Sequence, residues 1–89
     1  MKTVWKFPIQ ITDAYVIDMP AHAEVLFIAV QDGAPCMWAR VDPDAPRKPR
    51  AFCVAGTGHH LEPNAGTHLG SFMLANGALI FHVFDLETP

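Results

Sequence analysis

Short apolar runs separated by turn residues follow one another along the whole chain. The clearest run is Ala78–Leu86, which comes directly after Asn76-Gly77. Asn-Gly between two apolar runs predicts a hairpin, because both central residues of a type I′ turn need positive φ. The run is apolar on both faces of the expected strand, which is typical of a strand covered on both sides.

A two-residue turn also fixes which residues face each other across this hairpin. Ala75 then faces Ala78, Ser71 faces His82 and His68 faces Asp85. Directly opposed side chains lie roughly 5 Å apart. We therefore expect the Asp85 carboxylate to orient the His68 imidazole, and His82 to lie neutral among apolar neighbours.

Strand signals dominate the rest of the chain, and no stretch of ten or more residues has clean helical periodicity. Residues 10–19 also allow a single helical turn, because Thr12-Asp13 offers a cap or a turn. Two long loops are expected: the proline-rich segment 42–50, and the segment 56–66. The expected strands are 3–9, 15–19, 24–31, 36–42, 51–55, 67–74 and 78–86.

This order of elements predicts an all-β fold: one antiparallel meander of six or seven strands over residues 1–89, as a curled sheet, small barrel or sandwich. The length allows one domain. The core should contain Trp5, Phe7, Val25, Phe27, Ile28, Trp38, Val41, Phe52, Val54, Phe72, Leu79, Phe81 and Phe84.

Composition narrows the class of protein. Apolar residues make up 51% of the chain and charged residues 17%, with a net charge of −3. A nucleic-acid partner is not expected, because such proteins carry a strong positive balance. Cys36 and Cys53 lie in apolar runs, which predicts reduced, buried thiols. No apolar run is long enough to span a membrane. We expect an intracellular protein.

Low charge and two-sided apolar strands together favour self-association. The second face of the last strand carries Ile80, His82, Phe84 and Leu86. We expect this face to form the interface of a homo-oligomer, most simply a dimer.

Ligand or partner contacts are expected at three places in the sequence. His59 and His60 lie in the second loop, beside a Gly-Thr-Gly segment that can offer backbone N–H groups to an anion. The other two places are the basic cluster of the first loop and the central tryptophan. These candidates are Arg47, Lys48, Arg50 and Trp38.

Catalytic signals are weak, so an enzyme is not the favoured interpretation. Ser71 has His82 as its expected neighbour, but a third group is not evident. Zinc-type spacings are absent, and a metal-dependent hydrolase would have to use His59, His60, His68 and His82. We predict no catalytic residue, no metal and no cofactor.

Four segments carry a resemblance to a known family. They are residues 1–8, Pro35–Ala39, Gly56–His59 and Gly77–Phe84. The chain resembles the small uncharacterised proteins of tailed bacteriophages and prophages. That resemblance implies expression in the cytoplasm of a host bacterium and an accessory role, in which the protein binds and modulates a host protein. The alternatives are a binder of a small anionic or nucleotide-derived ligand, and the metal-dependent hydrolase.

Overall fold

A computed structural model describes residues 1–86, which form seven strands and one short 3₁₀ turn. All strands pair antiparallel. The all-β prediction is therefore confirmed. The elements are β1 (Thr3–Pro8), β2 (Tyr15–Pro20), β3 (Glu24–Gln31), β4 (Ala34–Val41), β5 (Arg47–Gly56), β6 (Ala65–Leu74), η1 (Ala75–Gly77) and β7 (Leu79–Leu86).

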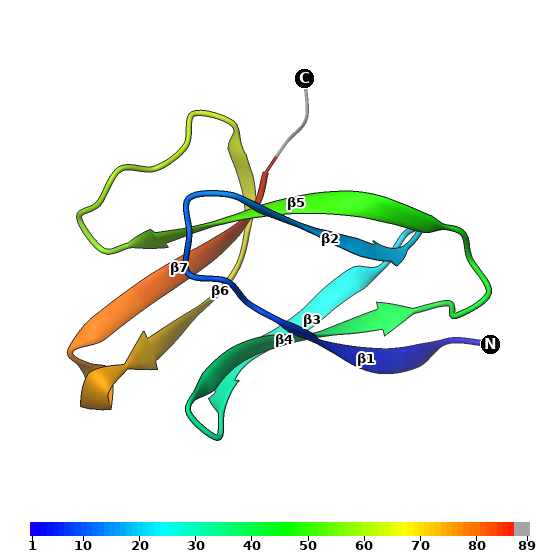
Figure 1. Ribbon diagram of the computed structural model, residues 1–89, viewed down its shortest axis with the longest axis horizontal. Helices are drawn as coiled ribbons and strands as arrows, with labels where there is room; N and C mark the ends of the chain where they lie inside the picture. The colour runs from blue at the N-terminus through cyan, green and yellow to red at the C-terminus, as the bar shows by residue number, and fades with distance from the viewer. Residues whose placement is uncertain (87–89) are drawn as a thin grey trace.

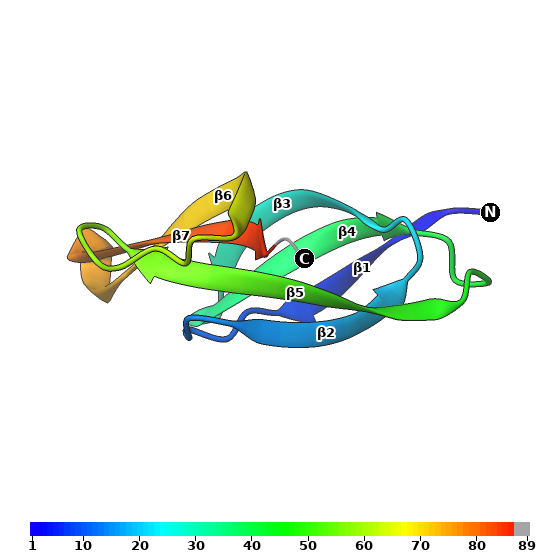
Figure 2. The same cartoon turned by 90° about the horizontal axis from the view of Figure 1, so that it is seen from above.

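The strands form two sheets that lie face to face without closing into a barrel (Figures 1 and 2). One sheet has three strands in the order β1-β4-β3, and the other has four in the order β2-β5-β7-β6. The order differs from a simple meander, because only β3–β4 and β6–β7 pair as consecutive strands. β1 and β2 pair instead with strands further along the chain, so the two sheets are interleaved in sequence.

The core fills the space between the inner faces of the two sheets. Met37, Ala39 and Val41 of β4 are almost fully buried and meet Phe52 of β5 and Val83 of β7 in one apolar cluster. Burial of apolar side chains between the sheets is the main stabilising contribution in a domain of this size. Of the expected core residues, six are buried: Phe7, Ile28, Val41, Phe52, Val54 and Phe72.

The edges of the two sheets meet where β3 lies beside β6. Ile28 packs directly over Gly70, and a Cβ at position 70 would lie 3.1 Å from the Cβ of Ile28. Glycine at this position therefore permits the close approach of the two sheets. On the other side of the molecule, the short strands β1 and β2 both end in a proline.

The predicted turn at Asn76-Gly77 is present. Asn76 has φ 55° and Gly77 has φ 87°, and the Ala78 N–H donates to the Ala75 carbonyl at 3.1 Å. These are the features of a type I′ turn. Ala75 also has positive φ, so regular pairing begins at Leu74 and Leu79. Ser71 faces His82, as the sequence predicted.

A bulge in β6 changes the pairing that the sequence predicted for His68. The pairing shifts between His68 and Gly70, so that His68 faces Phe84 and not Asp85. One extra residue in a strand moves every later side chain by one position. The Asp85 carboxylate lies instead on the inner face and accepts a hydrogen bond from Arg50 at 2.9 Å. The expected His68–Asp85 pair is therefore wrong.

A second bulge reverses the side on which Phe27 lies. The β3–β4 pairing shifts between Val25 and Phe27, which places Phe27 opposite Trp38. Val25 and Ile28 stay directed at the core, whereas Phe27 lies on the outer face and is exposed. Phe27 was expected in the core, and so was Leu79, which is also exposed.

The proline-rich loop is shorter than expected. β5 begins at Arg47, so only residues 42–46 connect it to β4, and Arg47, Lys48 and Arg50 are strand residues. They pair with Pro20, Met19 and Ile17 of β2. Within residues 1–86 no helix is long and apolar enough to cross a membrane.

Candidate functional site

The outer face of the three-stranded sheet, turned away from the core, carries two aromatic rings. Phe27 of β3 and Trp38 of β4 are opposed across the ladder, with ring centroids 5.6 Å apart. Phe27 is 59% exposed and Trp38 is half-buried. Tryptophan and phenylalanine in this partly exposed state are typical of the central residues of protein–protein interfaces.

Charged and polar groups surround this aromatic pair. The Lys6 ammonium lies 6.0 Å from the Trp38 ring centroid and donates to the Gln31 side-chain oxygen at 2.6 Å. Arg40 pairs with Glu24 at 3.1 Å on the same face. We call Phe27, Trp38 and Lys6 with these polar neighbours the aromatic face. An apolar centre with a polar rim is the usual anatomy of a binding surface.

The outer face of the four-stranded sheet is the second open surface. The residues predicted for self-association all lie along this face of β7: Ile80, His82, Phe84 and Leu86. Ile80 is exposed, and the other three are half-buried. Met73 of β6 and Val16 of β2 are exposed on the same face.

A chain of four hydrogen-bonding side chains crosses the middle of this second face. His68 Nε2 lies 3.1 Å from Ser71 Oγ, Ser71 Oγ lies 2.8 Å from His82 Nδ1, and His82 Nε2 lies 2.8 Å from Thr57 Oγ1. A neutral imidazole offers one donor and one acceptor. All three contacts are satisfied when donation runs from His68 to Thr57, and equally when it runs in the reverse direction.

Ser71 thus has the third group that the sequence did not reveal. His82 contacts Ser71 through Nδ1 and Thr57 through Nε2, an arrangement in which a base is oriented by a third residue. Ser71 nevertheless lies in the middle of a strand on an open face. Thr57 was missed because it follows β5, twenty-five positions before His82 in the sequence.

Two of the three basic residues of β5, Arg47 and Arg50, make contacts within the molecule, whereas Lys48 is exposed. The Arg47 guanidinium lies 4.9 Å from the Trp5 ring centroid. Arg50 lies over the Phe52 ring at 5.4 Å, and donates both to Asp85 at 2.9 Å and to the Ala23 carbonyl at 2.8 Å. Arg50 is therefore a structural residue that joins β5, β7 and the turn before β3.

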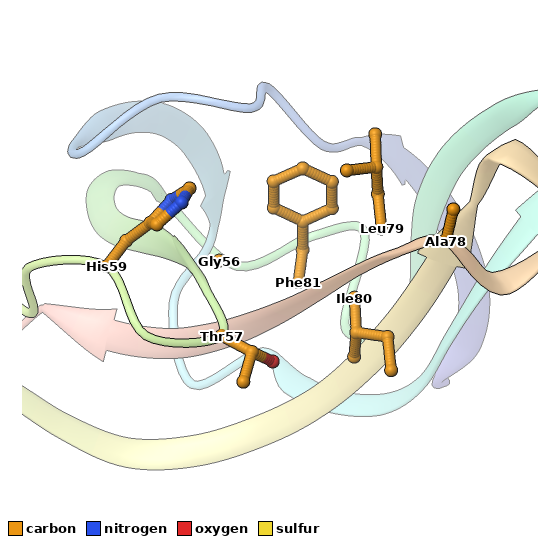
Figure 3. Close-up of a pocket in the computed structure, with 7 residues that line it drawn as sticks. All are labelled: Gly56, Thr57, His59, Ala78, Leu79, Ile80 and Phe81. Carbon is orange, nitrogen blue, oxygen red and sulfur yellow. The ribbon is translucent and has the colours of Figure 1, made fainter.

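His59 and His60 lie in the loop after β5, beside two hollows. One hollow of about 200 Å³ includes Thr57, His59 and Phe81 in its lining (Figure 3). The other, of about 300 Å³, includes Asp13, His60 and again His59 and Phe81. The His59 imidazole lies over Gly56, where an added Cβ would be only 2.7 Å from its Nδ1.

The histidines and the basic cluster do not form one site. Arg47 is the first residue of β5, whereas His59 follows its last residue, Gly56. Figure 1 shows that the two ends of β5 lie far apart. A strand of ten residues is about 33 Å long. The composite site for an anionic ligand, built from His59, His60, Arg47, Lys48 and Arg50, is therefore not assembled on one protomer.

The four histidines proposed for metal binding are also divided between places. His68 and His82 belong to the hydrogen-bonded chain on the sheet, whereas His59 and His60 lie in the loop. Among the side chains of residues 1–86, no group of three or more His, Cys, Asp or Glu is arranged to hold a metal ion.

Two buried groups have shifted protonation equilibria. Burial raises the pKa of the Tyr15 phenol well above its ordinary value of 10.0, and the neighbouring Cys53 adds to the shift. Burial likewise raises the pKa of the Cys53 thiol, with further contributions from Glu62 and Asp13. A thiol of this kind stays protonated and is a poor nucleophile at neutral pH.

The fold and its surfaces define a small two-sheet β protein with two open outer faces. A family model described as a domain of unknown function, DUF7352, matches residues 1–89. The chain belongs to this DUF7352 family. No curated protein and no solved structure matches it.

Proposed function

We propose that this protein acts by binding a partner protein, and that the aromatic face is its contact surface. The observation that carries the proposal is the opposed pair of Phe27 and Trp38 on an outer sheet face, beside Lys6 and the Arg40–Glu24 ion pair. A bulge turns Phe27 outward, away from the core that its apolar side chain would otherwise stabilise. Exposed aromatic groups of this kind mark interaction sites.

The partner, in this proposal, is a protein of a host bacterium. The basis is the resemblance of residues 1–8, Pro35–Ala39, Gly56–His59 and Gly77–Phe84 to small phage and prophage proteins. The protein would be phage-encoded, would act in the bacterial cytoplasm, and would modulate or inhibit the factor that it binds. Lys6, Arg40 and Glu24 around the rings would select among partners by charge.

The test compares Phe27→Glu with Val16→Glu. The two wild-type side chains are 59% and 60% exposed and lie on the outer faces of opposite sheets. Immobilised wild-type protein should retain a bacterial protein that Phe27→Glu fails to retain and that Val16→Glu still retains. Equal retention by both variants would show that the aromatic face is not the contact surface.

A homodimer through the outer face of the four-stranded sheet forms the second part of the proposal. Ile80, His82, Phe84 and Leu86 lie there with the exposed Met73, and the polar groups at the centre are already hydrogen bonded to each other. Burying satisfied polar groups carries little penalty. Analytical ultracentrifugation should give a dimer that Met73→Glu dissociates and Phe27→Glu does not; a monomer at every concentration would exclude it.

A further inference from the structure

The larger hollow beside His59 has the composition of a ligand site, with an apolar floor and a polar rim. Phe81 of β7 and the buried Val54 of β5 form the floor. Two loops that are far apart in the sequence supply the polar lining residues: Thr12 and Asp13 from one, and His59 and His60 from the other. The Val54 N–H donates to the Thr12 carbonyl at 3.2 Å, which fixes the first loop against β5.

The rim groups are free to contact a ligand. Within residues 1–86, the Asp13 carboxylate, the Thr12 hydroxyl and the His59 imidazole form no hydrogen bond or ion pair. His60 has only a distant contact with Glu62, at 4.0 Å. An apolar floor with a few convergent polar groups is the usual form of a small-molecule site.

The charge of the lining selects the class of ligand. Asp13 is the one carboxylate among the described lining residues, and neither hollow has a lysine or arginine among them. A phosphate placed here would be repelled by Asp13. A carboxylate accepts hydrogen bonds and therefore favours an N–H donor on the ligand.

We propose that this hollow binds a flat, uncharged heteroaromatic ring with an amino group, of the size of a nucleobase or nucleoside. The ring would lie against Phe81, because aromatic side chains stack on the flat face of any nucleobase. Its amino group would donate to Asp13, and the imidazole of His59 would border the ring. A volume of about 300 Å³ admits a ligand of nucleoside size.

Amide NMR titration of the full chain with adenosine, purine riboside and AMP tests the proposal. Adenosine should shift the amide signals of residues 11–13 and 54–60. Purine riboside lacks the amino group and should bind more weakly. AMP should bind up to about tenfold more weakly than adenosine, because its phosphate carries nearly two negative charges and each weakens binding about threefold at roughly 6 Å from Asp13 in water.

Three variants locate the effect. Asp13→Asn should remove the difference between adenosine and AMP, whereas Asp44→Asn, in the 42–46 connection, should preserve it. Gly56→Ala should displace the His59 ring and weaken adenosine binding. The proposal is overturned if AMP binds as tightly as adenosine, if the shifts lie elsewhere, or if millimolar adenosine produces none. Partner binding at the aromatic face is measured separately and does not depend on any of these results.

Discussion

Arg50 and Asp85 form a half-buried ion pair, 2.9 Å long, on the inner face of the four-stranded sheet. The same guanidinium donates to the Ala23 carbonyl, so that one side chain joins three segments. We expect Asp85→Asn to lower the free energy of unfolding by about 1–2 kcal/mol, because hydrogen bonds to charged groups contribute more than neutral ones and this pair is only partly solvated. Urea denaturation measures the change.

Glu24→Gln is the matched control for that variant. It weakens the Arg40–Glu24 pair, which has a similar distance of 3.1 Å but is more than half exposed. Exposed pairs contribute little, so its effect should stay within about 0.5 kcal/mol. Equal losses in the two variants would mean that burial adds nothing to the Arg50–Asp85 contact.

Tyr15→Phe should stabilise the protein by about 1 kcal/mol. The Tyr15 hydroxyl is buried and has no hydrogen-bond partner among the described residues, and such a group costs free energy in the folded state. Its ring packs on Phe52 at 5.5 Å, and phenylalanine would preserve that contact. Thermal unfolding measures the change, and a clear loss of stability would indicate a hydrogen bond that the phenol makes in solution.

The same substitution should change the response to alkaline pH. The unfolded chain loses the phenol proton near pH 10.0, whereas the folded chain retains it because the pKa of Tyr15 is raised. Above pH 10 the unfolded state therefore binds fewer protons, and stability falls as pH rises, by at most about 1.4 kcal/mol per pH unit. Tyr15→Phe should remove this part of the fall. The part due to Cys53, which begins near pH 9.0, should remain in both proteins.

Gly70→Ala should destabilise the fold by about 1–3 kcal/mol, because the new methyl group would lie 3.1 Å from the Ile28 side chain in a packed region. Ile28→Ala keeps the Cβ of residue 28 but removes Cγ1 and Cδ1, which would lie 3.2 Å and 3.4 Å from the new methyl group, and should relieve part of the clash. The loss of stability in the double variant Gly70→Ala/Ile28→Ala should therefore be smaller than the sum of the losses in the two single variants. Chemical denaturation of all four proteins checks this, and strict additivity would contradict direct contact.

Ser71→Ala should interrupt the chain between His68 and His82. The ring of His82 would keep its contact with Thr57 through Nε2 and lose its partner at Nδ1. Long-range ¹⁵N–¹H NMR should show a change in the tautomer populations of both histidines. Thr57→Val should change the His82 signals first; unchanged spectra in both variants would mean that water, not these hydroxyls, satisfies the rings.

Much of the fold could be predicted from the sequence, because apolar alternation and turn residues are local signals. The Asn76-Gly77 turn and the pairing of Ser71 with His82 are confirmed, since a type I′ turn fixes the register next to it. Beyond the bulge in β6 that register no longer applied, and His68 moved opposite Phe84. Gly70, an isolated glycine inside the strand pattern, is the local signal for this bulge, but it does not say on which side of the glycine the pairing shifts.

The candidate surfaces were harder to predict from the sequence, because they depend on a strand bulge and on contacts between residues that are far apart in the chain. Trp38 and Phe27 were both expected in the core, but Trp38 is half-buried on the outer face and Phe27 is exposed beside it, because the bulge in β3 turns Phe27 outward. Arg50, which was predicted as a ligand contact, forms an internal ion pair that the sequence analysis did not anticipate. Its partner Asp85 is thirty-five positions away, a distance at which sequence patterns carry no information.

The contact of Ile28 with Gly70 also bears on how the molecule resists aggregation. Unpaired strand edges invite pairing with other chains. Here the edge strands β3 and β6 cover each other, so β1 and β2 are the two edge strands that stay exposed. Each of these has only six residues and ends in a proline, Pro8 or Pro20, which cannot donate to an incoming strand. The sandwich can thus keep its broad faces apolar and available for binding without polymerising along its edges.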